Sequence, residues 1–428
     1  MSCSGTLVCE FAIDVIWRFS TVQAVKAHRV GLSSWQLIFG LGAVSLTTDM
    51  VADGARSVNG AILAQLGASA LVVGMVTGGA DAVALLLRLL TGPWVDRTGR
   101  YWSFTIIGYA LTALSVPLLA LAPFAGSAGL TLASVLLIAE RTGKAIRSPA
   151  KTVLLADATA AVGRGTGFGV HKTLDQLGAF LGPLLVAAVA AIEGSYWPAF
   201  LWLVIPAAAA MITLLRMRMQ VPDTAVLRPR LPAETPPRAT DAVPTEKTRA
   251  TFVLFASFAA LTTFGLIGFG VITFHLEDAD LVPSPAVSLV YGLAMLVAAV
   301  AAPATGRMYD RHGVSTLIIV PVLTAFVPAS CLADDLPLVL IGVGLWGMAT
   351  GIQDSTIKAF VADLVAPTHR GAAFGRLAVF QGVATLASGL TAGALYENVA
   401  LLTTLVIIAQ VIACVLLVLV LRRQGAHE

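Results

Sequence analysis

Long apolar stretches recur along the chain, each bounded by charged or turn-forming residues. A helix needs about 20 apolar residues to cross the ~30 Å hydrocarbon core of a bilayer. Twelve stretches of roughly that length lie near residues 36–58, 70–90, 102–122, 130–151, 168–191, 198–217, 251–274, 286–305, 314–332, 337–359, 372–393 and 399–421. The pattern predicts an all-α membrane protein with twelve transmembrane helices, six on each side of a break.

The break runs from Arg218 to Lys247 and interleaves prolines with charges, a composition that cannot bury a core. It predicts a linker between two six-helix bundles. The expected organisation is an N-terminal segment at 1–34, a first bundle at 35–217, a linker at 218–250, a second bundle at 251–421 and a tail at 422–428.

Composition agrees with a lipid environment. Of the 428 residues, 57% are hydrophobic and 12% are charged, whereas soluble domains carry about 25% charged residues. The formal net charge is only +3, so we expect no nucleic-acid partner. The four cysteines, at 3, 9, 331 and 414, are too scattered for a disulfide framework or a metal site. We therefore expect no metal and no cofactor.

Basic residues gather in every second loop, which predicts the orientation of the chain. Short cytoplasmic loops retain Lys and Arg. The loops at 91–101 and 306–313 are basic, whereas those that hold Glu193, Glu277 and Asp334 are acidic. We expect a multi-pass protein of the plasma (inner) membrane with both termini and the linker in the cytoplasm.

A repeat divides the chain in two. Residues 92–100 read Gly-Pro-Trp-Val-Asp-Arg-Thr-Gly-Arg, and residues 306–313 read Gly-Arg-Met-Tyr-Asp-Arg-His-Gly. A second pair of echoes, one beginning at Asp157 and the other at Asp363, lies at nearly the same distance. Two such matches indicate duplication, so the two bundles should be pseudo-symmetric.

Each copy falls between the second and third spans of its half, where the chain must reverse. Glycine supplies the positive φ that such a turn needs. We expect Asp96 near the start of the following helix, where its charge would meet the positive helix end, and Arg97 within reach of a phosphate or a carboxylate.

On these residues the sequence resembles the major facilitator superfamily, over about residues 35–421. The matching positions are Gly92, Asp96, Arg97, Gly99 and Arg100 in the first copy and Gly306, Asp310, Arg311 and Gly313 in the second. Tyr101 departs from the basic residue that usually ends the motif, and the second copy lacks its final Arg. The resemblance implies that this loop acts as a conformational latch between inward-open and outward-open states.

A second, partial resemblance lies in the fifth span. Gly178, Gly182 and Pro183 look like the Gly-x-x-x-Gly-Pro core that marks antiporters of the drug and proton branches of the superfamily. Small residues four apart let two helices approach closely, and proline permits a bend. Plain helix packing is the alternative interpretation of these residues.

Ionisable residues inside the spans are the candidate functional groups. A charge at the centre of a membrane helix costs at least ~2.5 kcal/mol, and such residues cluster in spans 1, 2, 4, 5 and 10. The candidates for proton coupling or the substrate cavity are Asp49, Asp53, Arg56, Asp81, Glu140, Arg141, Lys144, Arg147, His171, Asp175, Gln353, Asp354 and Lys358. Spans 3, 6, 9 and 12 carry ionisable residues only at their edges, and in the superfamily these four spans face lipid.

In the first half acids and bases balance, which suggests paired networks that exchange partners as a cavity opens on alternate sides. Asp81 and Glu140 are candidates for carrying a proton. Asp49 with Asp53 could do the same or contact a cationic substrate. Arg141 and Lys358 would instead favour an anionic substrate, and the alternative for Arg147, Lys151 and Lys172 is that they snorkel to the surface.

The resulting prediction is a monomeric secondary transporter that exports a small organic solute in exchange for protons by alternating access. An uptake symporter or facilitator is the alternative, and a transport-inactive sensor of the same fold is less favoured. No phosphate loop of an ATP pump is present. An enzyme is not expected, because His171 and Asp175 lack a third catalytic member.

Overall fold

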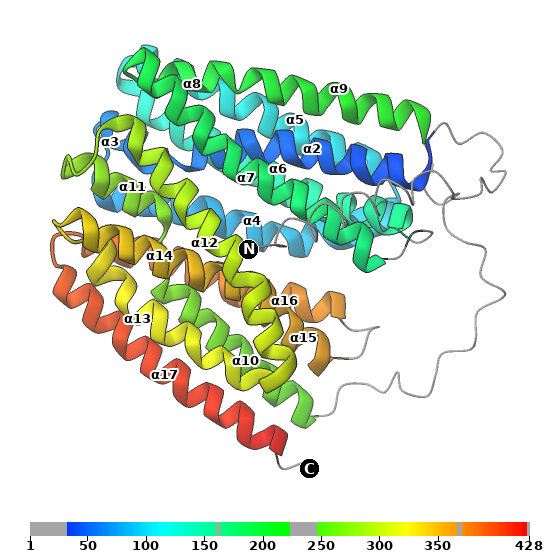
Figure 1. Ribbon diagram of the computed structural model, residues 1–428, viewed down its shortest axis with the longest axis vertical. Coiled ribbons are helices and arrows are strands. Elements are labelled where there is room, and N and C mark those ends of the chain that lie inside the picture. The colour runs from blue at the N-terminus through cyan, green and yellow to red at the C-terminus, as the bar shows by residue number, and fades with distance from the viewer. Residues whose placement is uncertain (1–31, 160–161, 163, 223–245, 366–369, 426–428) are drawn as a thin grey trace, which may run out of the picture.

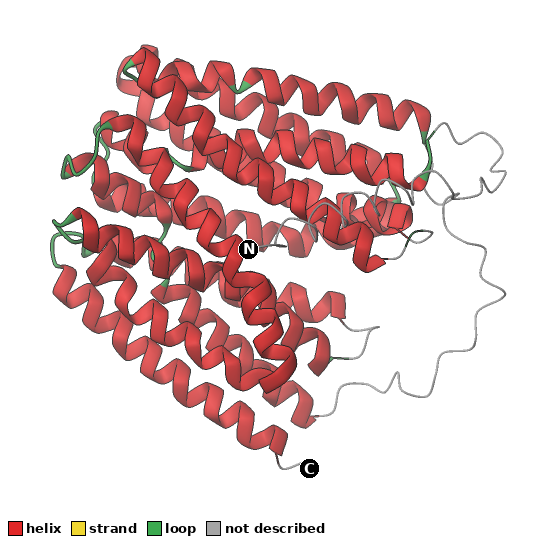
Figure 2. Cartoon of the chain, in the orientation of Figure 1, coloured by secondary structure: helices red, strands yellow, loops and turns green. Residues whose placement is uncertain are grey.

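The computed structural model describes residues 32–159, 162, 164–222, 246–365 and 370–425 (Figure 1). Throughout these residues the chain is helical, with short loops and without strands (Figure 2). Most of the predicted N-terminal segment and most of the predicted linker lie outside the described residues.

The first half contains the helices up to the linker. They are α2 (Ser34–Arg56), α3 (Asn59–Gln65), α4 (Ala70–Thr98), α5 (Tyr101–Leu118), η1 (Leu119–Ala128), α6 (Gly129–Thr159), α7 (Arg164–Glu193), α8 (Trp197–Trp202) and α9 (Val204–Gln220).

The second half follows the linker. Its helices are α10 (Glu246–Gly265), α11 (Phe269–Asp278), α12 (Ser284–His312), η3 (Gly313–Ile318), α13 (Ile319–Cys331), α14 (Leu336–Ile352), η4 (Gln353–Ile357), α15 (Lys358–Leu364), α16 (Arg370–Ala394) and α17 (Val399–Gly425).

Twelve crossings follow from the helix lengths, so the predicted all-α fold of twelve spans is confirmed. Nine continuous helical segments of the described chain are long and apolar enough to span a membrane. Two of them, Tyr101–Thr159 and Ser284–Cys331, contain 59 and 48 residues, which is enough for two crossings each. The shorter apolar helix Leu336–Ile352 begins the remaining crossing, which η4 and α15 continue.

Both halves break their first crossing at an equivalent place. In the first half, a short break after Arg56 separates α2 from α3. In the second half, a break between Gly265 and Phe269 separates α10 from α11. The short helices α3 and α11 pack against each other across the two halves. Their backbones approach closely at Gly60, where a Cβ would collide with the backbone of Gly270, and Gly60 N donates to Thr273 Oγ1 at 3.0 Å.

The repeated loop motif has a different local structure from the predicted one. The turns are made by Gly99 (φ 62°) and Gly313 (φ 63°), as expected for glycine at positive φ. However, α4 continues through Gly92 to Thr98. The prediction that Asp96 begins the following helix is therefore wrong: it lies in the last turn of α4, because only Gly99 takes the left-handed conformation that ends a helix.

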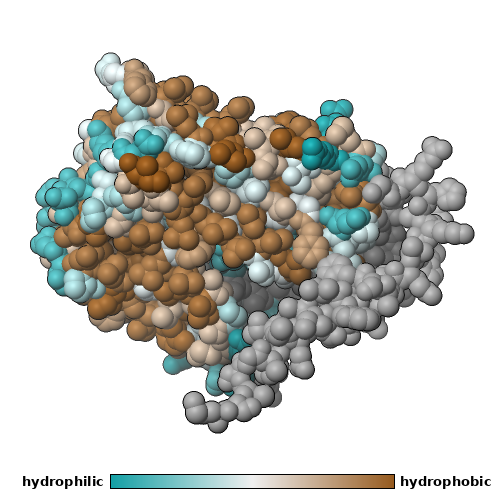
Figure 3. Space-filling view, turned by 45° about the horizontal axis from the view of Figure 1, so that its top comes forward, coloured by the Kyte–Doolittle hydropathy of each residue, from teal (hydrophilic) through white to brown (hydrophobic). Residues whose placement is uncertain are grey.

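Apolar side chains cover much of the outer surface, as a lipid-facing protein requires. Figure 3 shows hydrophobic residues spread over much of one face, with hydrophilic residues gathered toward its rims. Large exposed apolar side chains are frequent on α9 and α17, for example Ile212 and Val411. This surface suits hydrocarbon, where water would leave it poorly solvated.

The two halves share an apolar core at one end only. We call the end where α9 stops and α10 starts the linker end, and the opposite one the far end (Figure 1). At the far end a single cluster draws on both halves, including Ile62, Phe200, Phe274 and Leu402. Toward the linker end each half has its own separate cluster. Among the described residues, the halves therefore share their buried apolar core at the far end and have separate cores toward the linker end, although α4 and α16 remain in contact there as far as Leu89 and Gly375.

Candidate functional site

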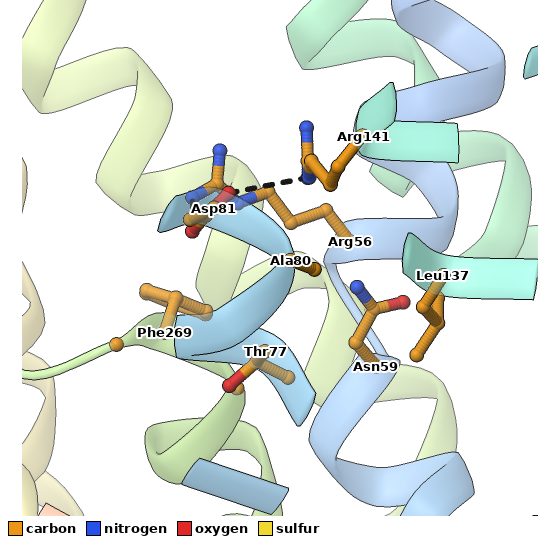
Figure 4. Close-up of a pocket in the computed structure, with 10 residues that line it drawn as sticks. Arg56, Asn59, Thr77, Ala80, Asp81, Leu137, Arg141 and Phe269 are labelled. Atoms are coloured by element: carbon orange, nitrogen blue, oxygen red, sulfur yellow. Dashed lines mark hydrogen bonds and ion pairs between the residues drawn. The ribbon is translucent and has the colours of Figure 1, made fainter. Parts of the chain in front are cut away.

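A chain of ion pairs centred on Asp81 lies inside the first half. Arg56 Nη2 of α2 donates to Asp81 Oδ2 of α4 at 2.7 Å. Arg141 Nε of α6 lies 3.2 Å from Asp81 Oδ1 and 3.2 Å from Glu140 Oε2. Figure 4 shows both guanidinium groups turned toward the Asp81 carboxylate. Because two cations share it, the charge of Asp81 is compensated within the protein.

A small polar pocket adjoins this network where the halves meet. Arg56, Asn59, Asp81 and Arg141 line it from the first half, and Phe269, beside the break before α11, lines it from the second (Figure 4). Asn59 Oδ1 is buried without a hydrogen-bond partner among the described residues. The free volume, about 20 Å³, is room for a single water. In this conformation the pocket is too small for an organic molecule.

A second network joins α2, α5 and α6. Arg147 Nη2 lies 3.7 Å from Asp49 Oδ1, and Arg147 Nη1 donates to Thr112 Oγ1 at 2.8 Å. The Arg147 guanidinium also lies 4.7 Å above the centre of the Tyr109 ring, a cation–π arrangement. Arg147 and Asp49 are both buried, so this Arg does not snorkel to the surface.

A third network lies on α6 and α7, nearer the linker end. Asp175 Oδ2 accepts from Lys172 Nζ at 2.6 Å, and Asp175 Oδ1 lies 3.8 Å from Lys151 Nζ. Lys151 Nζ donates to Ser45 Oγ at 2.9 Å. Ser45 Oγ also lies 3.2 Å from Nε2 of the buried His171. These groups form one polar face between α2, α6 and α7.

The remaining candidates of the first half connect these networks. Lys144 of α6 lies within electrostatic reach of Asp53 and Asp49. Asp53 Oδ1 accepts from Tyr291 Oη at 2.8 Å, so a buried hydrogen bond joins α2 to α12 across the halves. On the other side of α7, Pro183 faces Gly292 of α12.

The candidates of the second half lie on η4 and at the start of α15. Gln353 Oε1 accepts from Thr263 Oγ1 at 3.1 Å, and Asp354, in the π-helical turn η4, is exposed. The side chain of Lys358 lies outside the described part of the chain. Beside the pocket the second half presents aromatic rings: Phe269 packs against Tyr291 and Trp346, with ring centres 4.8 and 4.9 Å away.

Three site residues escaped the sequence analysis. Arg88 lies on α4, and its Nε is buried with no hydrogen-bond partner among the described residues. Its spacing of seven from Asp81 places both on one helical face, a signal that was available. Asn59 and Tyr291 gave no such signal, because neither is charged and their roles depend on how the two halves meet.

A separate cluster closes the far end. Glu277 of α11 accepts from Gln65 Nε2 at 2.7 Å and from Tyr196 Oη at 2.9 Å, which ties the second half to the first. Burial and the neighbouring Glu277 carboxylate raise the pKa of Tyr196, so its hydroxyl remains a donor. In the second half, Tyr396 Oη lies 2.9 Å from His275 Nδ1 and 3.1 Å from Asp278 Oδ2.

This architecture can be compared with known proteins. The family model described as Major Facilitator Superfamily matches residues 37–282 and 253–428, which together span both halves. The chain belongs to the major facilitator superfamily. The resemblance inferred from the loop motif is thereby confirmed, and the chain is a membrane transporter by family.

Relatives of this superfamily chain agree with that assignment. The uncharacterized Mycobacterium tuberculosis protein Rv2265 is 41% identical over 406 residues, covering 92% of this chain and 95% of its own. An uncharacterized MFS-type transporter of Methanocaldococcus jannaschii, MJ1317, is 26% identical over 148 residues, covering 35% of this chain and 36% of its own.

Solved superfamily structures share the fold at low identity. A bacterial homologue of the human lysosomal transporter Spinster, in an inward-facing and unoccupied conformation, has a TM-score of 0.68 at 15% identity and covers 91% of this chain and 97% of its own. A D-xylose-proton symporter has a TM-score of 0.62 at 15% identity, covering 89% and 96%. At this identity the likeness concerns the fold alone.

The superfamily loop motif shows different contacts in its two copies. Asp96, Arg97 and Arg100 are exposed, and Asp96 and Arg97 make no ion pair with another described residue. In the second copy Tyr309 Oη donates to Asp363 Oδ2 at 2.9 Å. The second repeated element is thus bound to the loop motif in the second half.

Proposed function

We propose that this transporter exports a small organic solute in exchange for protons by alternating access. The linker end is assigned to the cytoplasm of a cell with the protein in its inner membrane, which follows the basic loops at that end. The described conformation would then be inward-open, with its far end closed by the shared core and by Glu277.

The observation that carries this proposal is the position of the charges relative to the two cores. Buried and partly buried carboxylates of α2, α4, α6 and α7 lie between the shared core of the far end and the separate cores of the linker end. Groups placed there become accessible from alternate sides if the halves rock about their contact. A fixed dry interior would not retain so many charges, because each is costly when it cannot change partners.

Residues near the boundary between the halves support access from the linker end. The Lys172 side chain, in the third turn of α7, is 63% exposed, and it lies within electrostatic reach of Asp354 in the second half. Water therefore reaches the charge network from the side that we assign to the cytoplasm.

The substrate is not transferred from the structural neighbours. The neighbours include a nucleoside transporter, a peptide transporter and a D-xylose-proton symporter, whose cargoes are chemically unrelated. Export is favoured by the partial antiporter motif at Gly178, Gly182 and Pro183. Uptake by symport is the competing direction, and it would use the same charge networks.

The test compares cells that express the chain with null cells for accumulation of a panel of fluorescent cationic, zwitterionic and anionic compounds at several external pH values. Export coupled to protons predicts lower accumulation in expressing cells, with a difference that disappears when a protonophore collapses the gradient. Higher accumulation under an inward proton gradient would establish symport instead.

Reconstituted vesicles then test the coupling directly. The purified chain is placed in liposomes with an imposed pH gradient, and flux of the compound found in cells is followed together with internal pH. Asp81→Asn and Glu140→Gln variants should lose gradient-driven flux. If both variants transport as well as the parent, these two carboxylates take no part in coupling.

A further inference from the structure

A buried histidine joins three segments of the second half at the far end. His275, in the last turn of α11, is 5% exposed. Its Nε2 lies 3.0 Å from the carbonyl oxygen of Ala333, in the loop between α13 and α14. Its Nδ1 lies 2.9 Å from Tyr396 Oη, in the loop between α16 and α17. Both ring nitrogens therefore have a hydrogen-bond partner.

Tyr396 continues this chain of hydrogen bonds to a carboxylate. Its Oη lies 3.1 Å from Oδ2 of Asp278, the last residue of α11. Burial and the neighbouring Asp278 carboxylate raise the pKa of Tyr396, so the phenol keeps its hydrogen. That single hydrogen can be donated to His275 or to Asp278, but not to both at once.

The protonation state of His275 decides which of the two accepts it. The Ala333 carbonyl can only accept, so Nε2 must carry a hydrogen. In the neutral imidazole Nδ1 is then bare and takes the Tyr396 hydrogen, which leaves the tyrosine oxygen and the Asp278 carboxylate facing each other as acceptors. In the imidazolium Nδ1–H donates to Tyr396, and Tyr396 donates to Asp278. Only the protonated ring therefore completes all three bonds.

We propose that His275, Tyr396 and Asp278 form a proton-binding site at the far end, and that the bound proton favours the closed far end. Proton uptake forms the Nδ1–H bond, and the Tyr396 hydrogen turns from His275 to Asp278. Histidine suits this role, because its side chain ordinarily changes charge between about pH 5 and pH 8. The site lies outside the ion-pair networks of the first half and does not depend on the proposed export.

The link to closure is α11, which also meets the first half. Thr273, two residues before His275, accepts a hydrogen bond from the backbone of α3. Glu277, two residues after it, accepts from Gln65 and Tyr196. Opening the far end requires α11 to leave these partners, and a shift of α11 against the two loops would break the bonds of His275. Since a ligand shifts the population toward the state that binds it better, the proton favours closure.

The other charged and titratable groups near His275 come from several segments. They are Glu277 and Asp280 in and after α11, Asp334 and Asp335 before α14, Glu397 before α17, and Tyr196 before α8. The helix α3 carries none, and the arginines of α16 lie in its first two turns, near the linker end. Asp81 of α4 and Tyr291 of α12 lie beside Phe269, at the opposite end of α11. In the described part of the far end, the added proton thus meets acids and no Lys or Arg.

Labelling of a cysteine at the pocket tests this site without any substrate. In a chain whose native cysteines are replaced, Thr77→Cys, at a position that lines the pocket, reacts with a membrane-impermeant reagent added from the far end. The rate is measured at about pH 8 and about pH 5.5, with the same pH on both sides of the membrane. Each rate is divided by that of the same reporter in His275→Gln at that pH, which cancels the reactivity of the thiol itself.

Glutamine can still donate to Ala333 but takes up no proton. The two chains should therefore react alike at the higher pH, where the histidine is neutral. At the lower pH the parent should react about ten-fold more slowly, the effect of one hydrogen bond to a charged group. Tyr396→Phe keeps His275 but removes the hydroxyl between it and Asp278, so it should lose most of this difference.

The control is His312→Gln, which alters an exposed histidine in the last turn of α12 and should keep the pH response of the parent. Helix content by circular dichroism verifies that each variant is folded. If His275→Gln did not fold, Tyr396→Phe would serve as the reference for the parent rates.

The proposal is overturned if the parent and His275→Gln react alike at both pH values, or if Tyr396→Phe keeps the whole pH response. Faster labelling of the parent at the lower pH would also overturn it, since the proton would then favour the open far end. A pH response as expected in a chain without proton-driven flux would keep this site and remove the proposed coupling. Proton-driven flux without the pH response would keep the coupling and remove this site.

Discussion

The two halves of this transporter share a fold but have opposite interiors. All six ion pairs that join two described side chains lie within α2, α4, α6 and α7 of the first half. The second half packs aromatic rings instead, such as Phe255 on Phe360 with centres 4.1 Å apart and Phe269 on Trp346. The two halves therefore share a helix topology but differ in the side chains that fill their interiors.

Ion pairs and packed aromatic rings respond differently when helices move. Ion pairs can exchange partners with little change in backbone position, so a charged half can respond to protons. Close-packed rings have one favourable arrangement and resist displacement. We infer that the first half responds to the transported protons and the substrate, while the second half, apart from the histidine site at its far end, is the rigid wall against which it moves. The following changes test that division.

The largest effect is expected from Asp81→Asn. It leaves Arg56 and Arg141 facing each other without their shared carboxylate, and breaking a buried ion pair by removing one partner costs about 3–5 kcal/mol. Because Asp81 is a quarter exposed, the lower figure is expected. We expect a lower midpoint of thermal unfolding in detergent and loss of flux.

Asp334→Asn is the matched control for this change, since Asp334 is an exposed loop acid of the second half. Its unfolding midpoint and its flux should match the parent. Equal effects of the two substitutions would show that the chain does not distinguish charges in its two halves, and the comparison would fail.

The next effect concerns the helix crossing in the charged half. Gly178→Ala inserts a methyl group into the backbone of α2 at Leu46, and such overpacking costs about 1–3 kcal/mol. The control is Gly169→Ala on the same helix, where nothing lies within 4 Å. That change should be neutral or slightly stabilising, because alanine favours helix over glycine.

For Gly178→Ala and Gly169→Ala, two quantities should be measured: the free energy of unfolding in denaturant and the pH dependence of transport. Gly178→Ala should lower stability and also move α7 away from the charged face of α2, whereas Gly169→Ala should alter neither. If Gly178→Ala reduced stability without changing the pH dependence of transport, the close crossing would be structural only.

The twelve spans and the superfamily loop could be predicted because they depend on local properties. Apolar length decides whether a helix can cross a membrane, and Gly99 and Gly313 are needed wherever the chain turns at positive φ. The end of α4 was misplaced because the whole motif from Gly92 onward, including Pro93, was assigned to the turn. Both residues tolerate helical φ, so the helix continued to Gly99.

The partners of the charged residues could not be predicted from spacing. The spacing of Asp49, Asp53 and Arg56 by four and three predicts a shared helical face. In the structure their partners are Arg147, Tyr291 and Asp81 respectively. Helical periodicity gives a shared face but not the neighbours, which depend on how other helices cross it. For the same reason Tyr291, an uncharged residue of the other half, could not be anticipated.

Glu277→Ala tests how strongly the two halves are held together at the far end. The change removes the acceptor for Gln65 and Tyr196, and hydrogen bonds to a charged group contribute about 1.5–3 kcal/mol. Gln65 is exposed and Glu277 is partly exposed, so we expect the lower end of that range. The closed state should lose about ten-fold in population relative to the open one.

Labelling of a pocket cysteine measures this opening. In a chain whose native cysteines are replaced, Thr77→Cys is treated with a membrane-impermeant reagent from the far end. The rate should rise about ten-fold in Glu277→Ala and remain unchanged in the control Glu397→Ala, an exposed acid of a neighbouring loop. An unchanged rate in both would mean that the apolar core alone keeps the far end closed.

The smallest effect is expected from Trp346→Phe in the aromatic half. Trp346 Nε1 donates to the Ile267 carbonyl at 2.8 Å, beside the break between α10 and α11. Phenylalanine keeps most of the packing on Phe269 and loses this bond, so the free energy of unfolding should fall by about 1 kcal/mol. The pH dependence of transport should remain that of the parent, because no titratable group is altered or moved. A shifted pH profile would show that the rings of the second half also set the proton affinity of the first, and the division of tasks between the halves would have to be abandoned.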